Sequence, residues 1–129
     1  MTFRKDIKMN VLDLLLKSEN KTFNLPNEKV KIKRLSKTFG EDVIFELSAL
    51  SLDRLEELRG KEDFYSLAVL EGVKEPNLKD KRLQEKFNVH TPIEALKKML
   101  SAGEIDDLYI KISHLSGYGM KTYEEVKKN

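Results

Sequence analysis

The first third of the chain switches between a helical and a strand-like hydrophobic pattern. Between residues 7 and 17 apolar side chains recur every three or four positions, which predicts a short amphipathic helix. Its apolar stripe consists of Val11, Leu12, Leu15 and Leu16. Residues 28–33 and 43–47 instead alternate with period two, so each predicts a β-strand. We expect these strands to pair antiparallel, with further strand between Arg34 and Phe39.

Each predicted strand has one apolar face. Val30 and Ile32 face inward from the first strand, and the second strand has a matching set. That set consists of Val43, Phe45 and Leu47, with Ile44 and Glu46 on the opposite face. Two strands alone are marginally stable in water, so we expect the pair to pack on helices.

Helix start and stop signals dominate the rest of the chain. Ser51 is a cap for a helix that stops at Gly60, with Leu52, Leu55 and Leu58 as its buried stripe. Further helices are predicted at about 62–71, closed by Gly72, and at about 79–86, ending at Asn88. The loop between them contains Pro76 and Asn77.

Two later helix starts are especially clear. Thr91-Pro92-Ile93-Glu94 reads as a capping box with proline at the first helical position. Ser101-Ala102-Gly103-Glu104 repeats the Ser-x-x-Glu form, and Gly117 ends the helix that follows. The predicted fold is therefore α+β: a small antiparallel β-hairpin or sheet packed against several short helices, with a helical C-terminal half. We expect one domain over 1–118 and a flexible tail over 119–129.

The last helix carries the longest apolar stripe, and Tyr118 continues it. A domain of this size has limited core to cover such a stripe, so we expect part of it to be exposed and to contact a partner. The predicted partner-contacting residues are Ile105, Leu108, Tyr109, Ile112, Leu115 and Tyr118.

Composition narrows the class of protein. The 24 basic and 22 acidic residues are interspersed and leave a net charge of +2, which favours neither nucleic acid nor an acidic membrane surface as partner. With no cysteine among 129 residues, disulfides and thiolate metal sites are excluded. The longest apolar run, Leu14 to Leu16, is far short of the roughly 20 residues that a membrane span needs. No signal-peptide pattern is present, so we expect a cytosolic protein.

No group of residues predicts catalysis, a cofactor or a metal. His90 and His114 fall in separate elements without nearby ligand motifs, whereas a metal site needs three or four converging ligands. The sequence Gly117-Tyr118-Gly119 follows a helix, whereas phosphate loops precede one. The carboxylates in Glu56-Glu57 and in Asp106-Asp107 are neighbours on a helix and point in different directions. We therefore expect a protein that is not an enzyme.

One basic group could contact nucleic acid. It consists of Lys29, Lys31, Lys33, Arg34 and Lys37. No aromatic residue interleaves with these cations to stack on bases, and a lysine-rich strand also discourages edge-to-edge aggregation. We therefore expect these five residues to form a solvent-exposed face and not a nucleic-acid-binding site.

Several short sequences in the C-terminal half occur in a particular order. They are Glu75-Pro76-Asn77-Leu78, a short helix with Leu83, Glu94-Ala95-Leu96 through Met99-Leu100, Ser101-Ala102-Gly103-Glu104, and Leu115-Ser116-Gly117-Tyr118. In order and spacing they resemble the C-terminal signature of the XkdN-like tail assembly chaperones of phages and prophages of Gram-positive bacteria. A strand at 43–47 followed by a helix from Ser51 also fits this family.

The resemblance implies a non-enzymatic role in building a phage tail. Proteins of this family bind the long tape measure protein before the tail tube forms around it, so the expected partner is the tape measure protein of the same phage or prophage. Self-association, a place in the bacterial host cytoplasm and absence from the mature virion are also expected. A longer frameshifted form is a further hypothesis, because Lys127-Lys128 can be encoded by an A-rich slippery run.

Two alternatives come from other classes of protein. The helices between Asp80 and Leu115 could form the helix-turn-helix of a DNA-binding regulator, but Glu104, Asp106 and Asp107 would repel phosphate at the start of its last helix. A structural head–tail or tail connector is the other alternative, and it would remain in finished particles.

Overall fold

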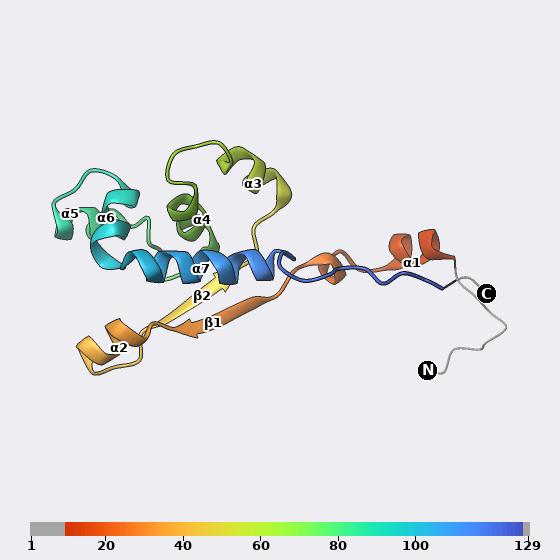
Figure 1. Cartoon of the computed structure of the whole chain (residues 1–129), viewed down its shortest axis with the longest axis horizontal. Helices are drawn as coiled ribbons and strands as arrows, with labels where there is room; N and C mark the ends of the chain where they lie inside the picture. The colour runs from red at the N-terminus through yellow and green to blue at the C-terminus, as the bar shows by residue number, and fades with distance from the viewer. Residues whose placement is uncertain (1–9, 128–129) are drawn as a thin grey trace.

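The computed structural model describes residues 10–127 (Figure 1). Over these residues the helices are α1 (Val11–Lys17), α2 (Lys33–Phe39), α3 (Leu52–Leu58), α4 (Phe64–Gly72), α5 (Lys81–Phe87), α6 (Pro92–Met99) and α7 (Ala102–Leu115). The strands are β1 (Asn27–Lys31), β2 (Ile44–Ser48) and β3 (Val73–Glu75), and a short 3-10 helix, η1, covers Asn20–Phe23. The predicted α+β fold class is confirmed.

The three strands form one antiparallel sheet in the order β1-β2-β3. The predicted pairing of β1 with β2 is confirmed, with Val30 opposite Phe45 and Lys29 opposite Glu46. Strand β3 follows α4 directly and was not predicted. Phe45 and Leu47 are buried beneath the helices, whereas Ile44 is exposed on the opposite face. One face of the sheet is thus covered and the other is open, as is common in antiparallel sheets.

The prediction of further strand between Arg34 and Phe39 was wrong, because this segment is helix α2. Ile32 and Ser36, one helical turn apart, are both buried, and Ser36 Oγ accepts a hydrogen bond from the Val43 N–H at 2.8 Å. Gly40 ends the helix with a left-handed φ of 70°, a conformation that glycine adopts without strain. Lys33, Arg34 and Lys37 therefore lie on α2, so the predicted basic group is divided between a strand and a helix.

The core lies between the sheet and helices α4, α6 and α7. In Figure 1, α7 crosses above the sheet with α4 beside it. Leu47, Leu96 and Ile112 are almost fully buried at this junction. Gly72 allows α4 to approach α7 closely, because a Cβ atom at this position would lie 2.9 Å from Ile112 Cγ1. Leu52, predicted to be buried, is exposed because it is the first residue of α3, at the edge of the core.

The two predicted capping boxes differ in detail. At Ser101 the box is complete: Ser101 Oγ accepts from the Glu104 N–H at 3.2 Å, and Glu104 Oε1 accepts from the Ser101 N–H at 2.8 Å. At Thr91 only one half of the box forms. Thr91 Oγ1 caps the Glu94 N–H at 3.2 Å, but the Glu94 carboxylate accepts from the Thr91 hydroxyl instead of from its N–H. Both helix starts were predicted correctly.

The N-terminal helix stands apart from the body of the molecule. In Figure 1, α1 and η1 form an arm that leaves the body at the same end as the C-terminal residues. No residue of α1 is buried, although its predicted apolar stripe is present. The first residues of that predicted helix, 7–9, lie outside the described range. Residues 119–127 form neither helix nor strand and are exposed.

Candidate partner-binding surface

The predicted stripe on α7 is divided between core and surface. Ile105, Leu108 and Ile112 are buried, so the expectation that these three residues contact a partner is not supported by their position. They are covered because both α4 and the sheet pack against α7. The remaining three residues of the stripe reach the surface: Tyr109 and Leu115 are half-buried, and Tyr118 is exposed.

Three aromatic side chains from α4 and α7 meet beside this stripe. The ring centroids of Tyr65 and Tyr109 are 4.5 Å apart, and Phe64 lies 5.6 Å from Tyr109. Such tilted and edge-on contacts are the favourable geometry for aromatic pairs. We call Phe64, Tyr65 and Tyr109 the aromatic cluster. Tyr65 is 54% exposed, so the cluster presents a large apolar ring with a polar hydroxyl to solvent.

Sequence reasoning missed Tyr65. Helix α4 is apolar on nearly all sides, so its pattern does not show which residues face outward. The signal that could have identified Tyr65 as a surface residue is its side-chain chemistry, because tyrosine favours positions where its ring is buried and its hydroxyl contacts water.

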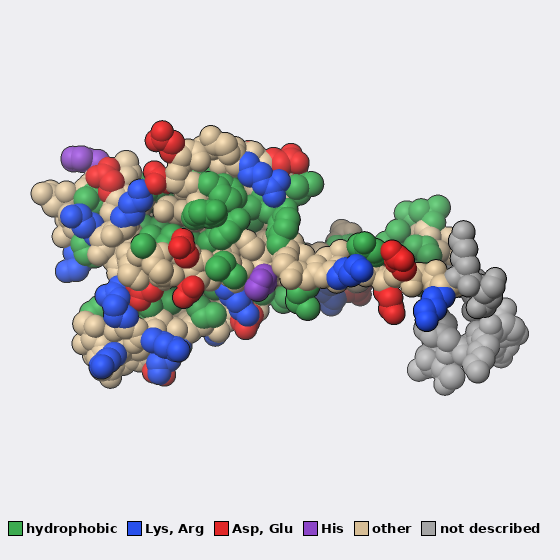
Figure 2. Space-filling view, in the orientation of Figure 1, with side chains coloured by type: hydrophobic (Ala, Val, Ile, Leu, Met, Phe, Trp, Pro, Cys, Tyr) green, Lys and Arg blue, Asp and Glu red, His purple; other side chains and the backbone are tan. Residues whose placement is uncertain are grey.

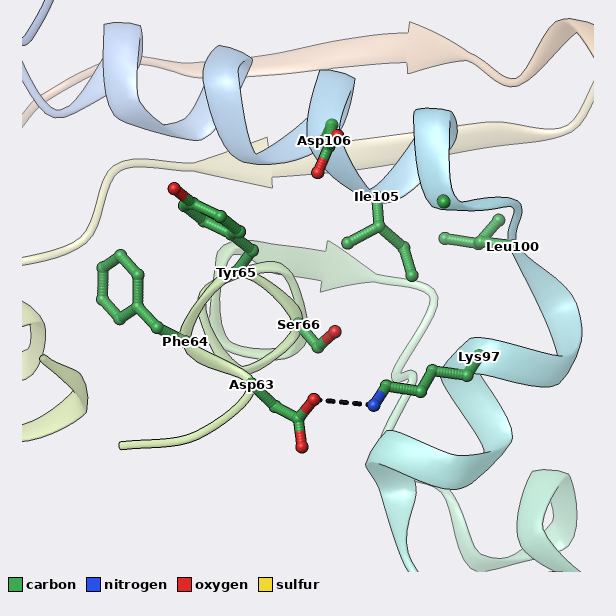
Figure 3. A pocket seen from close by; sticks show the side chains of 9 residues that line it. Asp63, Phe64, Tyr65, Ser66, Lys97, Leu100, Ile105 and Asp106 are labelled. Carbon is green, nitrogen blue, oxygen red and sulfur yellow. Dashed lines mark hydrogen bonds and ion pairs between the residues drawn. The ribbon is translucent and has the colours of Figure 1, made fainter. Parts of the chain in front are cut away.

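A cleft of about 660 Å³ adjoins the aromatic cluster, between α4, α6 and α7 (Figure 3). We call it the α4–α7 cleft. Its apolar lining consists of Phe64, Tyr65, Leu100, Ala102 and Ile105, and its polar lining of Asp63, Ser66, Lys97 and Asp106. Lys97 Nζ lies 2.6 Å from Asp63 Oδ1 and closes one side of the cleft (Figure 3). Asp106, on α7, forms no ion pair with any residue in the described range.

Hydrophobic side chains gather on the same face of the molecule, over α4 and α7 (Figure 2). Beyond the end of α7, Tyr118 is held against the end of α3. Its hydroxyl accepts a hydrogen bond from Arg59 Nη2 at 2.9 Å, and the Arg59 guanidinium lies 6.0 Å from the centre of its ring. The accessible part of the predicted stripe thus continues from the aromatic cluster to Tyr118.

Two carboxylates with lowered pKa values lie in ion pairs between elements of the fold, outside the cleft. A hydrogen bond from Arg54 lowers the pKa of Glu71, with a further contribution from Lys79 and an opposing effect of burial. A hydrogen bond from Arg34 likewise lowers the pKa of Glu104. The Arg54–Glu71 and Arg34–Glu104 pairs join residues 17 and 70 positions apart, so these charges tie elements of the fold together.

The residues considered for chemistry are dispersed. His90 is exposed in the turn before α6, and His114 is exposed on α7. Between residues 10 and 127, no three His, Asp or Glu side chains lie close enough together to hold one metal ion. In the same range no helix has the length and hydropathy needed to cross a bilayer.

The fold and this surface define a small α+β domain that presents aromatic side chains next to an apolar cleft, a form suited to binding another protein. The model of the phage XkdN-like tail assembly chaperone family matches residues 60–128, and the chain belongs to this family. The resemblance seen in the C-terminal half is thereby confirmed.

A solved structure shares the fold. The crystal structure of the protein YqbN superposes with a TM-score of 0.60 at 25% sequence identity, and the match covers 79% of this chain and 98% of that one. No curated protein matches the chain.

Proposed function

We propose that this chain binds the tape measure protein of the same phage or prophage and keeps it soluble while the tail is assembled. The observation that supports this most directly is the position of the aromatic cluster. Phe64, Tyr65 and Tyr109 all lie within residues 60–128, the segment that matches the tail assembly chaperone family. The surface that we propose for the partner therefore lies within the matched segment.

The physical basis is burial of apolar surface. A long helical protein exposes its apolar stripes until tail subunits cover them, and exposed stripes of this kind drive aggregation. An amphipathic helix can lay such a stripe into a hydrophobic groove. Tyr65 and Tyr109 are suited to this contact because tyrosine is among the residues that contribute most to binding energy at interfaces.

In this proposal the chain acts by binding alone, in the cytoplasm of the bacterial host, and leaves before the virion is complete. Tyr109, Leu115 and Tyr118 are the residues of the α7 stripe that would touch the tape measure protein, together with Tyr65. Leu108, Ile105 and Ile112 would support this surface from beneath.

The test is co-expression of the full chain with the tape measure protein encoded by the same element. We expect the soluble fraction of the tape measure protein to rise and the two proteins to elute together in size-exclusion chromatography. Tyr65→Ala should reduce this rescue, whereas Phe39→Ala should not, because Phe39 is equally aromatic and exposed but lies on α2, outside the family match. A tape measure protein that stays insoluble beside free chaperone would contradict the proposal.

Two further measurements separate the alternative functions. A connector would be found in purified virions, where a chaperone would be missing. A DNA-binding regulator would shift labelled DNA from the same element in an electrophoretic assay, with a strong dependence on salt.

A further inference from the structure

Helix α1 carries an exposed apolar surface that no residue between 10 and 127 buries. Its five large apolar side chains are between 49% and 72% exposed, and no residue of the helix is buried. They are Val11, Leu12, Leu14, Leu15 and Leu16. At 100° per residue they occupy one broad side of the helix, opposite Asp13 and Lys17.

Such a helix needs a covering surface to be stable. Isolated helices this short are marginal in water, and most helical stability in proteins comes from packing of the apolar face. Asn10 caps the start of α1, since its Oδ1 accepts from the Asp13 N–H at 3.1 Å, but one cap contributes only about 1 kcal/mol. The helical conformation of α1 therefore points to a docking partner.

The α4–α7 cleft has the complementary properties. Five of its nine lining residues are apolar, and its size is in the range of pockets that bury several apolar groups. At its rim the carboxylate of Asp106 has no cationic partner within residues 10–127. Lys17, in the last turn of α1, has a long flexible side chain that can reach a carboxylate at the edge of the cleft while the leucines insert.

We propose that α1 of one copy docks in the α4–α7 cleft of a second copy of this chain. Figure 1 shows α1 on an arm directed away from the body, leaving near the C-terminal end of α7, whereas the cleft lies at the N-terminal end of that helix. The helix and its receptor are thus at opposite ends of the molecule. Two copies that exchange arms bury both helices, and docking in a head-to-tail series buries one helix for each added copy.

This self-association does not depend on the proposed function. Helix α1 lies outside residues 60–128, so it is not part of the segment matched by the family. The two proposals meet at Tyr65, which belongs to the aromatic cluster and also borders the cleft. A tape measure helix laid over Tyr65 would compete with the arm, so binding of the tape measure protein would release α1.

The chain has no cysteine, so a disulfide can be introduced at one chosen contact. Leu15→Cys and Ala102→Cys are made in separate full-length chains, one of them carrying a mass tag, and the two are mixed under mild oxidation. Ala102 is exposed and lines the cleft. We expect a covalent heterodimer on a non-reducing gel. The matched control pairs Ala102→Cys with Leu52→Cys, an equally exposed leucine on α3, and should give several-fold less of this product.

Sedimentation tests the same contact without cross-linking. The full chain should associate with increasing concentration, and the triple variant Leu12→Ser/Leu15→Ser/Leu16→Ser should weaken association at least tenfold, toward the 15.0 kDa monomer. At a concentration where the parent chain is monomeric, the thermal unfolding of the variant should match that of the parent, because no α1 residue belongs to the core. A chain that stays monomeric, association that survives the triple substitution, or a Leu15→Cys/Ala102→Cys chain that cross-links only within itself would each overturn the proposal.

Discussion

Arg34 of α2 and Glu104 of α7 form a bidentate ion pair between residues 70 positions apart in the sequence. Arg34 Nε donates to both carboxylate oxygens at 3.2 and 3.1 Å, and Nη2 donates to Oε1 at 2.8 Å. The same Nη2 also donates to the Met99 carbonyl at 2.8 Å. Since Glu104 closes the capping box with Ser101, one carboxylate both starts α7 and joins it to α2.

This arrangement predicts a specific dependence of stability on pH. The Arg34 hydrogen bond holds the pKa of Glu104 below its ordinary 4.5, despite an opposing effect of burial, and the Ser101 N–H adds to the shift. A carboxylate whose pKa is depressed by folding stabilises the fold fully above its unfolded value, and this contribution is lost as pH falls through the folded value. We therefore expect part of the thermal stability to disappear as pH falls below 4.5.

Melting curves of Glu104→Gln test this expectation. The variant should be less stable than the parent at pH 7, and the difference between them should shrink as pH falls below 4.5. Asp107→Asn is the matched control, because Asp107 is an exposed carboxylate of the same helix and takes part in no ion pair of the described residues. If the melting temperatures of the parent and of Glu104→Gln differ by a constant amount from pH 7 to pH 3, the ionised Glu104 carboxylate is not the source of the pH dependence.

The helix caps allow a second prediction. Thr91→Ala and Ser101→Ala should each lower the free energy of unfolding by about 1 kcal/mol, because each leaves one helix N–H without its side-chain acceptor. The loss at Ser101 should be the larger one, since only that box is complete. Urea unfolding is the measurement. Thr91→Ser keeps the hydroxyl and should remain close to the parent, and unchanged midpoints for both alanine variants would remove the capping assignment.

These caps could be predicted because capping is local chemistry. A serine followed three residues later by a glutamate can form a capping box at the first turn of a helix. Ser101 and Glu104 therefore predict a helix start without knowledge of the tertiary fold. Helix α2 could not be read in the same way. The strand-like alternation of Lys29, Val30, Lys31 and Ile32 leads directly into α2. A prediction that extends this alternation therefore places a strand where Ile32 and Ser36 form the buried face of a helix.

The candidate partner-binding surface shows a different limit of prediction from sequence. A periodic stripe reveals which side of a helix is apolar but not what covers it. Half of the stripe on α7 is buried under α4 and the sheet, whereas every residue of the stripe on α1 is exposed. Short strand β3 follows α4 without any alternating pattern, because three residues are too few to show one. Coverage depends on the tertiary fold, so the aromatic cluster became visible only when α4 and α7 were placed together.

The close approach of α4 to α7 at Gly72 makes a third prediction. Gly72→Ala should destabilise the fold by about 1–3 kcal/mol, because the added methyl group overlaps the Ile112 side chain in the core. Ile112→Val alone should cost about 0.5–1.5 kcal/mol by removing a buried methyl group.

In the Gly72→Ala/Ile112→Val double variant the combined cost should be less than the sum of the two, since valine lacks Cδ1, the Ile112 atom nearest to the added methyl group, although Cγ1 and Cγ2 remain 2.9 Å away. A double-mutant cycle of unfolding free energies measures this coupling. Gly103→Ala is the control, because a Cβ at Gly103, in the first turn of α7, meets no atom within 4 Å. Strictly additive costs would show that the overlap is relieved elsewhere.

Tyr118 provides the last prediction, which separates binding from folding. Its ring is 44% exposed and is held at the end of α7 by Arg59, so it can contact a partner while contributing little to the core. Tyr118→Ala should weaken binding of the tape measure protein by more than about 1 kcal/mol, or about fivefold or more, and should leave the melting temperature nearly unchanged. Tyr118→Phe keeps the ring and loses only the hydroxyl that accepts from Arg59, so it should bind more tightly than the alanine variant.

Titration calorimetry of the Tyr118 variants with the tape measure protein, together with thermal unfolding, gives affinity and stability on the same samples. A large loss of stability with unchanged affinity would instead make Tyr118 a support of the fold, and the partner surface would then be confined to the aromatic cluster.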